Sequence, residues 1–160
     1  MGVVQGPAIL GVPRRPAAHG VRARGEGAAA VSFKWDSPVF FDELDLNGTL
    51  HNSRFAVHVE RAQSALFEQL GKGWSQFADR DEDLRYVVRT LHIEFLAAFT
   101  SPGMLPIELT ADKIGTTSAV YGFQCGQYAR GYRVIVKVDA DGKPSPWSDW
   151  YRTMFAGMQQ

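Results

Sequence analysis

The hydrophobic pattern of the chain changes from helical to extended near its middle. Between Asn52 and Leu70 the apolar residues recur at steps of three and four, which places them on one face of a helix: Phe55, Val59, Ala62, Leu66 and Leu70. Gly71 follows, where a left-handed residue commonly ends a helix. Asn47, Asn52 and Ser53 could each cap its first turn. The pattern predicts one amphipathic helix of about 18–20 residues.

Most of the remaining chain shows the alternation of β-strands. Residues 31–41 read as a strand that Pro38 either breaks or places at a sheet edge. After residue 85 one face gathers the odd-numbered residues Val87, Arg89, Leu91, Ile93 and Phe95. Runs 105–114, 117–125 and 132–138 also alternate, with turn residues between them. The order is a strand, a long helix and at least four further strands, which predicts an α+β fold with a mostly antiparallel sheet.

Three segments are less regular. Residues 1–30 are rich in Gly, Ala, Pro and Arg. They are predicted to be a disordered tail without chemistry, a targeting peptide being the alternative. The domain is predicted to span residues 31–160. The charged run 71–84 is interpreted as a solvated turn, and the pattern of residues 147–155 leaves open whether they form a helix or an edge segment.

Composition limits the function classes. Lys plus Arg number 17 and Asp plus Glu number 17, and this net charge of zero argues against a nucleic-acid partner. No apolar run approaches the ~20 residues of a membrane span, so no membrane association is expected. The single Cys125 fits a reducing compartment and predicts a cytoplasmic protein. Aromatic and β-branched residues on both strand faces predict a homo-oligomer, a dimer or a tetramer.

The polar segment from Asp42 to Asn52 allows three interpretations. A calcium loop starting at Glu43 would need a bidentate Glu at its twelfth position, which is Arg54 instead. The segment could also be only a turn that caps the helix. The third interpretation is a catalytic carboxylate beside a helix N-terminus, where free N–H groups stabilise an oxyanion.

This segment and the helix after it resemble the active-site region of a known family, the hotdog-fold thioesterases. The run FDELDLNGTLHNSRF is similar to the pattern D-x-D-x-x-G-H-V-N-N-x-x-Y of the 4-hydroxybenzoyl-CoA thioesterase type and the related acyl-ACP thioesterases. The matching positions are Glu43, Asp45, Gly48, Asn52 and Phe55. Thr49 stands where the family often has His, and His51 where it has the first Asn. Later segments also resemble the family, so the resemblance covers residues 33–148.

The resemblance implies a hotdog fold, an antiparallel sheet wrapped around one long central helix, with active sites at the seam of two subunits. It further implies hydrolysis of an acyl-CoA or acyl-ACP thioester without a metal or other cofactor. The implied site is divided into catalytic residues, Asp45, His51 and Asn52, and substrate-binding residues, Phe55, Gly48 and Thr49. A non-catalytic acyl-thioester binding protein is the alternative, and a hydratase on the same fold is a third possibility.

Other candidates carry weaker signals. His58 on the predicted helix and His92 in a strand are expected to be ordinary surface or interface residues. Cys125 alternates with Tyr121 and Phe123, which predicts a small core residue rather than a nucleophile. No paired His or Cys spacing typical of a zinc site is present.

Overall fold

The computed structural model describes residues 32–72 and 81–159. The predicted tail, residues 1–30, lies outside the described residues, as do Val31, residues 73–80 and Gln160 of the predicted domain.

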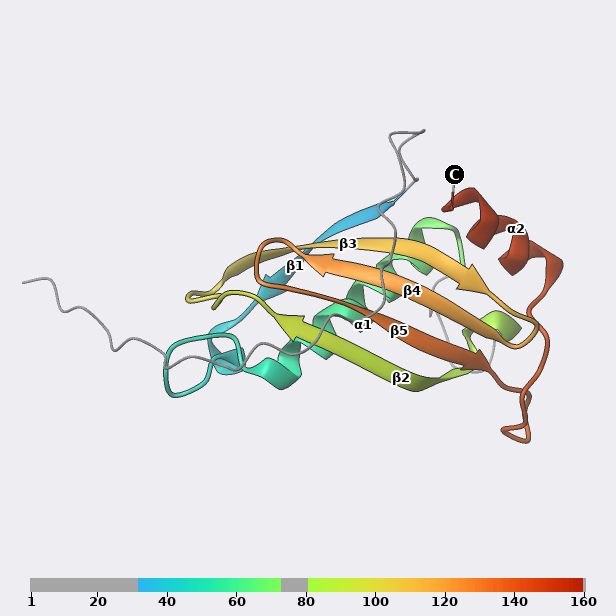
Figure 1. The fold of residues 1–160 in the computed structure, drawn as a ribbon, viewed down its shortest axis with the longest axis horizontal. Coiled ribbons are helices and arrows are strands. Elements are labelled where there is room, and N and C mark those ends of the chain that lie inside the picture. The colour runs from blue at the N-terminus through green and yellow to red at the C-terminus, as the bar shows by residue number, and fades with distance from the viewer. Residues whose placement is uncertain (1–31, 73–80, 160) are drawn as a thin grey trace, which may run out of the picture.

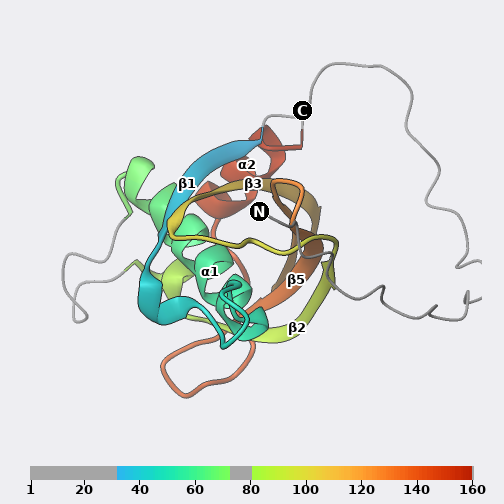
Figure 2. The same ribbon diagram turned by 90° about the vertical axis from the view of Figure 1, so that its left-hand side faces the viewer.

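A single antiparallel sheet curves around one long helix (Figures 1 and 2). Its five strands have the order β1-β3-β4-β5-β2. They are β1 (Phe33–Val39), β2 (Tyr86–Phe95), β3 (Gly103–Ile114), β4 (Ser118–Cys125) and β5 (Ala129–Lys137), and the helix α1 spans Asn52–Gln69. Viewed along the helix, Figure 2 shows α1 lying in the concave side of the sheet. The predicted α+β fold, with a sheet wrapped around a central helix, is confirmed.

The predicted apolar face of α1 is the face that the sheet covers. Four of its residues are at most 5% exposed: Phe55, Val59, Ala62 and Leu66. Leu70, the fifth residue of the predicted face, is 41% exposed, because it lies past the last helical residue. Two polar residues of α1 are also buried, His58 and Gln63. The expectation that His58 is a surface or interface residue is therefore wrong, because the side chain is 0% exposed within the single chain.

Both ends of α1 have identifiable caps. Gly71 has a φ of +72° and its N–H bonds to Glu68 O, while the N–H of Lys72 bonds to Phe67 O, the pattern of a Schellman motif. The C-terminal prediction is confirmed. The N-cap, however, is His51, whose Nδ1 accepts a hydrogen bond from the Ser53 N–H. The predicted caps Asn47, Asn52 and Ser53 are wrong, because an imidazole nitrogen takes the role usually given to a side-chain oxygen.

Among the described residues, strand β1 lies at one edge of the sheet and pairs only with β3. Pro38 is opposite Met104 in this edge strand. Because proline has no N–H to give to a second neighbour, the edge position tolerates it. The edge alternative of the prediction is confirmed.

Strand β2 forms the other edge and contains a β-bulge. Val88 is opposite Ile135, but the next paired residue is Thr90, opposite Val134, so Arg89 is an extra residue. The bulge reverses the alternation, which places Tyr86 and Ile93 on the same, helix-facing side of the strand. The predicted face that joined Val87 and Arg89 to Ile93 is therefore wrong in its first half.

Strands β3 and β4 follow the predicted alternation. The inner residues of β4 are at most 4% exposed: Ala119, Tyr121, Phe123 and Cys125. Cys125 is thus a core residue, and burial raises the pKa of its thiol to about 12. This protonated, buried thiol has no access to a substrate, so the prediction of a structural cysteine is confirmed.

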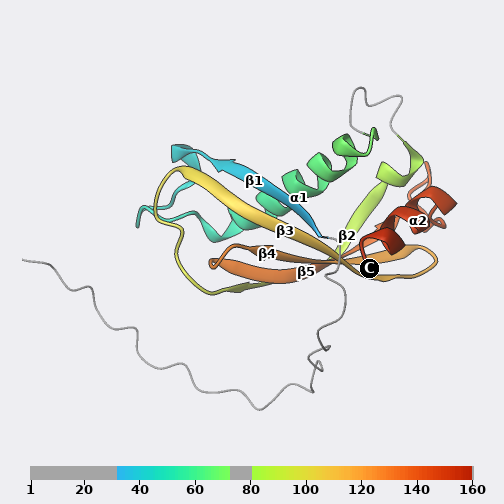
Figure 3. The ribbon, with the colours of Figure 1, turned by 90° about the horizontal axis from the view of Figure 1, so that it is seen from above.

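A second helix, α2 (Asp149–Gly157), covers one end of the sheet (Figure 3). It begins at Ser148, whose Oγ accepts a hydrogen bond from the Tyr151 N–H. Tyr151 and Phe155 are both 0% exposed, and the Tyr151 ring stacks on Trp147 with centroids 3.9 Å apart. The segment 147–155, for which the sequence pattern left helix and edge segment open, therefore forms a helix from Asp149 onward.

The start of α2 is fixed by a buried acid. Asp83 lies within the short helical turn η2 (Glu82–Leu84) and is 1% exposed. It accepts hydrogen bonds from Lys137 Nζ at 2.8 Å and Ser148 N at 3.1 Å. The interpretation of residues 71–84 as a solvated turn is therefore wrong for Asp83. No helix in the described residues has the length and apolar character needed to cross a membrane.

Candidate functional site

The candidate site begins in a small hairpin that precedes α1. A short helical turn, η1 (Phe41–Glu43), leads into an isolated bridge between Leu44 and Leu50. At the tip, Gly48 has a φ of +71°, a conformation that residues with a Cβ rarely adopt. The hairpin therefore returns the chain from Asp45 to the start of α1 within a few residues.

The carboxylate of Asp45 is held by donors from its own hairpin. Asp45 Oδ1 accepts hydrogen bonds from Asn47 N at 2.8 Å and Thr49 N at 3.1 Å, and Oδ2 accepts one from Thr49 Oγ1 at 3.1 Å. The Thr49 N–H is the largest influence among these bonds, which together hold the pKa of Asp45 below its ordinary value of 3.8. Asp45 is therefore ionised near neutral pH, and its orientation is fixed by Thr49.

The start of α1 lies beside this carboxylate. The Ser53 N–H bonds to His51 Nδ1 and Asn52 Oδ1, and the Arg54 N–H bonds to His51 O. Within the described residues, no hydrogen bond uses the N–H of Asn52. Because His51 Nδ1 accepts the hydrogen bond from the Ser53 N–H, its Nε2 is the ring nitrogen that can donate to a bound molecule.

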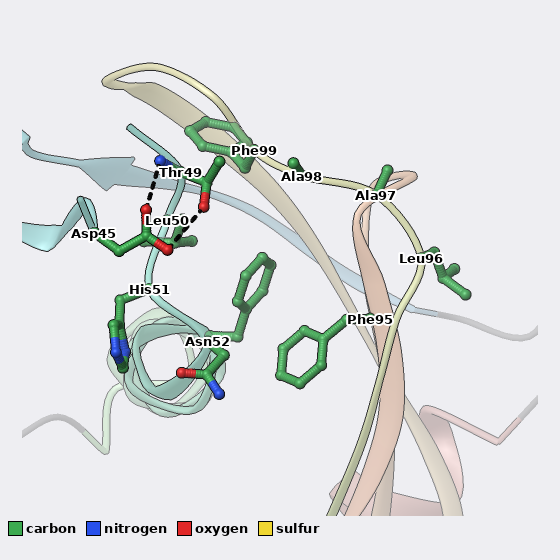
Figure 4. Close-up of a pocket in the computed structure, with 11 residues that line it drawn as sticks. Asp45, Thr49, Leu50, His51, Asn52, Phe95, Leu96, Ala97, Ala98 and Phe99 are labelled. Atoms are coloured by element: carbon green, nitrogen blue, oxygen red, sulfur yellow. Dashed lines mark hydrogen bonds between the residues drawn. The ribbon is translucent and has the colours of Figure 1, made fainter. Parts of the chain in front are cut away.

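These polar groups form one wall of a cavity of about 530 Å³ (Figure 4). The opposite wall comes from the end of β2 and the segment after it, residues 95–99. The Phe55 and Phe95 rings meet edge to face with centroids 5.5 Å apart, and the Leu50 N–H bonds to Phe99 O at 2.8 Å. The cavity therefore combines a carboxylate and a helix start with an apolar, aromatic wall.

The structure brings most of the predicted site residues together. Five of the six line the cavity: Asp45, Thr49, His51, Asn52 and Phe55. Gly48 is not among the lining residues, and its place is the tip of the hairpin. Phe95, Leu96 and Phe99, which lie far along the chain, were not predicted to be site residues. Their apolar run was visible, but no sequence pattern places it opposite Asp45.

The remaining candidates lie elsewhere. His92 is exposed on the outer face of the sheet, where its ring stacks on Tyr132 with centroids 5.3 Å apart, as expected of a surface residue. His58 is buried behind the hairpin. Across residues 32–72 and 81–159, no group of three or more His, Cys, Asp and Glu side chains is arranged to hold a metal ion.

A sheet curved around one long helix, with an acidic hairpin at the start of that helix, defines the hotdog class of proteins. The family model described as the thioesterase superfamily matches residues 47–124. This match covers just under half of the chain and, together with the hotdog fold, supports a relationship to the thioesterases. The match begins two residues after Asp45, so it says nothing about that acid.

Individual relatives agree with this family. The acyl-CoA thioester hydrolase YbgC of Escherichia coli is 26% identical over 89 residues, which are 56% of this chain and 65% of that protein. The matched region thus spans slightly less than two thirds of the curated relative. The solved structure of the PA2801 protein from Pseudomonas aeruginosa is 25% identical with a TM-score of 0.66, covering 76% of this chain and 96% of that one.

A second solved structure shows the same fold. A predicted thioesterase from Bacillus stearothermophilus has a TM-score of 0.70 at 19% identity, covering 81% of this chain and 97% of that one. The described core of this protein therefore corresponds to nearly the whole of both solved structures.

Proposed function

We propose that this protein hydrolyses acyl thioesters, with acyl-CoA as the substrate and Asp45 as the base or nucleophile. The observation that carries the proposal is the position of Asp45, ionised and fixed by Thr49, in the same cavity as the start of α1. The match to an acyl-CoA thioester hydrolase supports the choice of substrate class.

The cavity offers a place for each part of the reaction. The thioester carbonyl would lie against the N–H of Asn52, whose partial positive charge stabilises the oxyanion that develops. Asp45 would either attack the carbonyl carbon and expel the thiolate, forming an anhydride that water cleaves, or deprotonate a water that attacks directly. His51 Nε2–H and the Asn52 amide would orient water or substrate, and Phe55 and Phe95 would contact the acyl group.

We also propose that two copies pair along β2, as a dimer or as half of a tetramer. In the part of the chain that the structure describes, this edge strand bonds to β5 on one side only. It exposes apolar side chains along its length: Val87 52%, Val88 43%, Leu91 42% and Phe95 50%. A long apolar edge favours pairing with another strand. Because the cavity wall continues directly from β2, the second copy would lie beside the cavity. Leu91→Lys should therefore yield monomers in analytical ultracentrifugation.

The proposal is tested by measuring thiol release from acyl-CoA and acyl-ACP substrates of different chain lengths. Asp45→Asn and Asp45→Ala should lower kcat by about a hundredfold or more while the protein stays folded. Asp42→Asn is the matched control, since Asp42 is exposed in η1 and does not line the cavity. Activity of Asp45→Ala at the wild-type level would refute the assignment of Asp45.

A non-catalytic acyl-thioester binding protein is the second candidate, because the same cavity would hold the same ligands. Thr49 in place of the family's usual histidine favours it. Binding of acyl-CoA by calorimetry without thiol release, for every chain length, would support this alternative. Release from acyl-ACP alone would change the carrier but keep the reaction.

The single free, buried Cys125 supports action in the cytoplasm.

A further inference from the structure

A buried polar network lies behind the candidate site and is not part of the cavity wall. It joins Ser37 of β1, Glu43 of η1 and His58 of α1, which are 0%, 4% and 0% exposed. Ser37 Oγ and His58 Nδ1 are 2.5 Å apart, and His58 Nε2 is 3.5 Å from Glu43 Oε1. Three buried polar side chains in contact are costly unless their partners satisfy them, so the network is expected to have a definite role.

The serine of this network is not placed to act as a nucleophile. A serine, a histidine and an acid in a row are reminiscent of a catalytic triad. Ser37, however, has no exposed surface and does not line the candidate cavity. A substrate carbonyl cannot reach its hydroxyl, so a different role must be found for the three residues.

Glu43 is the centre of the network and carries its charge. Burial raises the pKa of Glu43, but the Phe40 N–H, His58 and Arg61 outweigh burial and hold it below its ordinary value. Glu43 Oε2 accepts a hydrogen bond from Phe40 N at 3.0 Å, and Oε1 accepts one from Arg61 Nη1 at 3.1 Å. Glu43 is therefore an ionised carboxylate bound to α1 through Arg61.

The proton of His58 is directed by this carboxylate. Burial is the largest influence on His58 and lowers its pKa, so the ring is neutral at pH 7. A proton on Nε2 points toward Glu43, whereas a lone pair there would face a negative charge. The Ser37 hydroxyl then donates to Nδ1. Glu43 therefore has a hydrogen bond to Arg61 of α1 and faces His58 Nε2 at 3.5 Å, a contact without a hydrogen bond.

The backbone of Glu43 connects the network to the candidate site. Glu43 O accepts a hydrogen bond from the N–H of His51, the N-cap of α1, at 3.0 Å. Glu43 immediately precedes the Leu44–Leu50 bridge that closes the hairpin, and Asp45 is two residues further along the chain. A shift of Glu43 would therefore move Asp45 relative to the start of α1.

We propose that Glu43 is a positioning residue: hydrogen-bonded to Arg61 and in contact with His58 of α1, it fixes the hairpin so that Asp45 faces the start of the helix. The inference rests on the proposed function for its catalytic consequence. Misplacing a reacting group by about 1 Å can lower a rate by about a hundredfold. A fixed hairpin would thus be a requirement for catalysis.

Glu43→Gln tests this role with two independent measurements. The variant keeps the shape of the side chain but removes its charge and directs an amide N–H₂ toward His58 and Arg61. We expect kcat to fall by about tenfold to a hundredfold, with KM within about twofold of wild type. In an Asp45→Asn background Glu43→Gln should cause no further loss, because Glu43 acts through Asp45.

The second measurement does not depend on activity. In ¹⁵N relaxation at pH 7, the order parameters S² of the Asn47 and Thr49 amides should fall from about 0.85, typical of a rigid backbone, in the wild type to below about 0.6 in Glu43→Gln. Glu82→Gln is the matched control, since Glu82 of η2 is an exposed acid that pairs with Lys137 of β5. Absence of thioesterase activity in the wild type would refute the proposed function, while the order parameters would still test the positioning.

Two outcomes would overturn the inference: rigid Asn47 and Thr49 amides in folded Glu43→Gln, or a kcat loss that multiplies with that of Asp45→Asn. Should Glu43→Gln fail to fold, Arg61→Gln replaces it, because Arg61 is 42% exposed and its substitution leaves the core intact. We then expect the same increase in hairpin motion and a kcat loss of about threefold or more. No change in either quantity would overturn the inference.

Discussion

Removing the carboxylate of Asp83 should be the most destabilising polar substitution at the α2 end of the protein. Lys137 Nζ is 2.8 Å from Asp83 Oδ1, and the two side chains are 3% and 1% exposed. Asp83→Ala would leave Lys137 with only the exposed Glu82, at 3.2 Å, as its partner. Breaking one partner of a buried pair costs about 3–5 kcal/mol, and the remaining contact to Glu82 places our expectation near 3 kcal/mol.

The loss should spread to α2. The Ser148 hydroxyl donates to Asp83, and its oxygen accepts the first-turn N–H of Tyr151, so the acid also fixes the N-cap of the helix. For a domain of this size, a loss of about 3 kcal/mol corresponds to a decrease in Tm of about 6–12 °C. Thermal and urea unfolding followed by circular dichroism measure this change.

A double variant separates the charge from the packing. Asp83→Leu combined with Lys137→Met removes both charges and should recover most of the stability, since apolar residues often replace a buried pair without cost. Glu82→Gln, which leaves the buried partner in place, should cost less than about 1 kcal/mol. A loss below about 1 kcal/mol in Asp83→Ala would refute the reasoning that this pair stabilises the fold.

Three further predictions concern pH and individual residues. Burial lowers the pKa of Lys137, but Asp83 and Glu82 outweigh burial and raise this pKa above 10.5. The stabilisation by Lys137 is therefore complete below pH 10.5 and is lost as the pH rises through the pKa of the folded state. Urea unfolding at alkaline pH measures this loss. Thr49→Val should raise the pKa of Asp45 toward 3.8 in a ¹³C-carboxyl titration, because one hydrogen bond to the carboxylate is lost. Gly48→Ala should lower the free energy of unfolding by about 1–2 kcal/mol in urea unfolding. A Cβ at this position would meet no atom within 4 Å, so the cost comes from the φ of +71°, which is unfavourable for alanine.

The sequence determined the features that depend on near neighbours. The apolar repeat from Phe55 to Leu66 and the glycine at position 71 specified the long helix and its end, because both are set within one or two turns. The alternation in β3 and β4 likewise specified which residues face the core. In β5 it did not, because the buried residues of the run 132–138 are Arg133, Ile135 and Lys137, while the apolar alternating residues lie on the other face. The motif resemblance brought Asp45 and Asn52 into one hypothesis, and both line one cavity.

Tertiary structure decided the features that depend on distant partners. The bulge at Arg89 has no local signal, because it arises only when β2 is paired with β5. The sequence predicted His58 to be a surface or interface residue and assigned Glu43 only to a motif position, but the curvature of the sheet around α1 buries both and brings them within 3.5 Å. The aromatic wall opposite Asp45 exists because the Leu50 N–H reaches Phe99 O from the other side of the fold, a contact that no local pattern encodes.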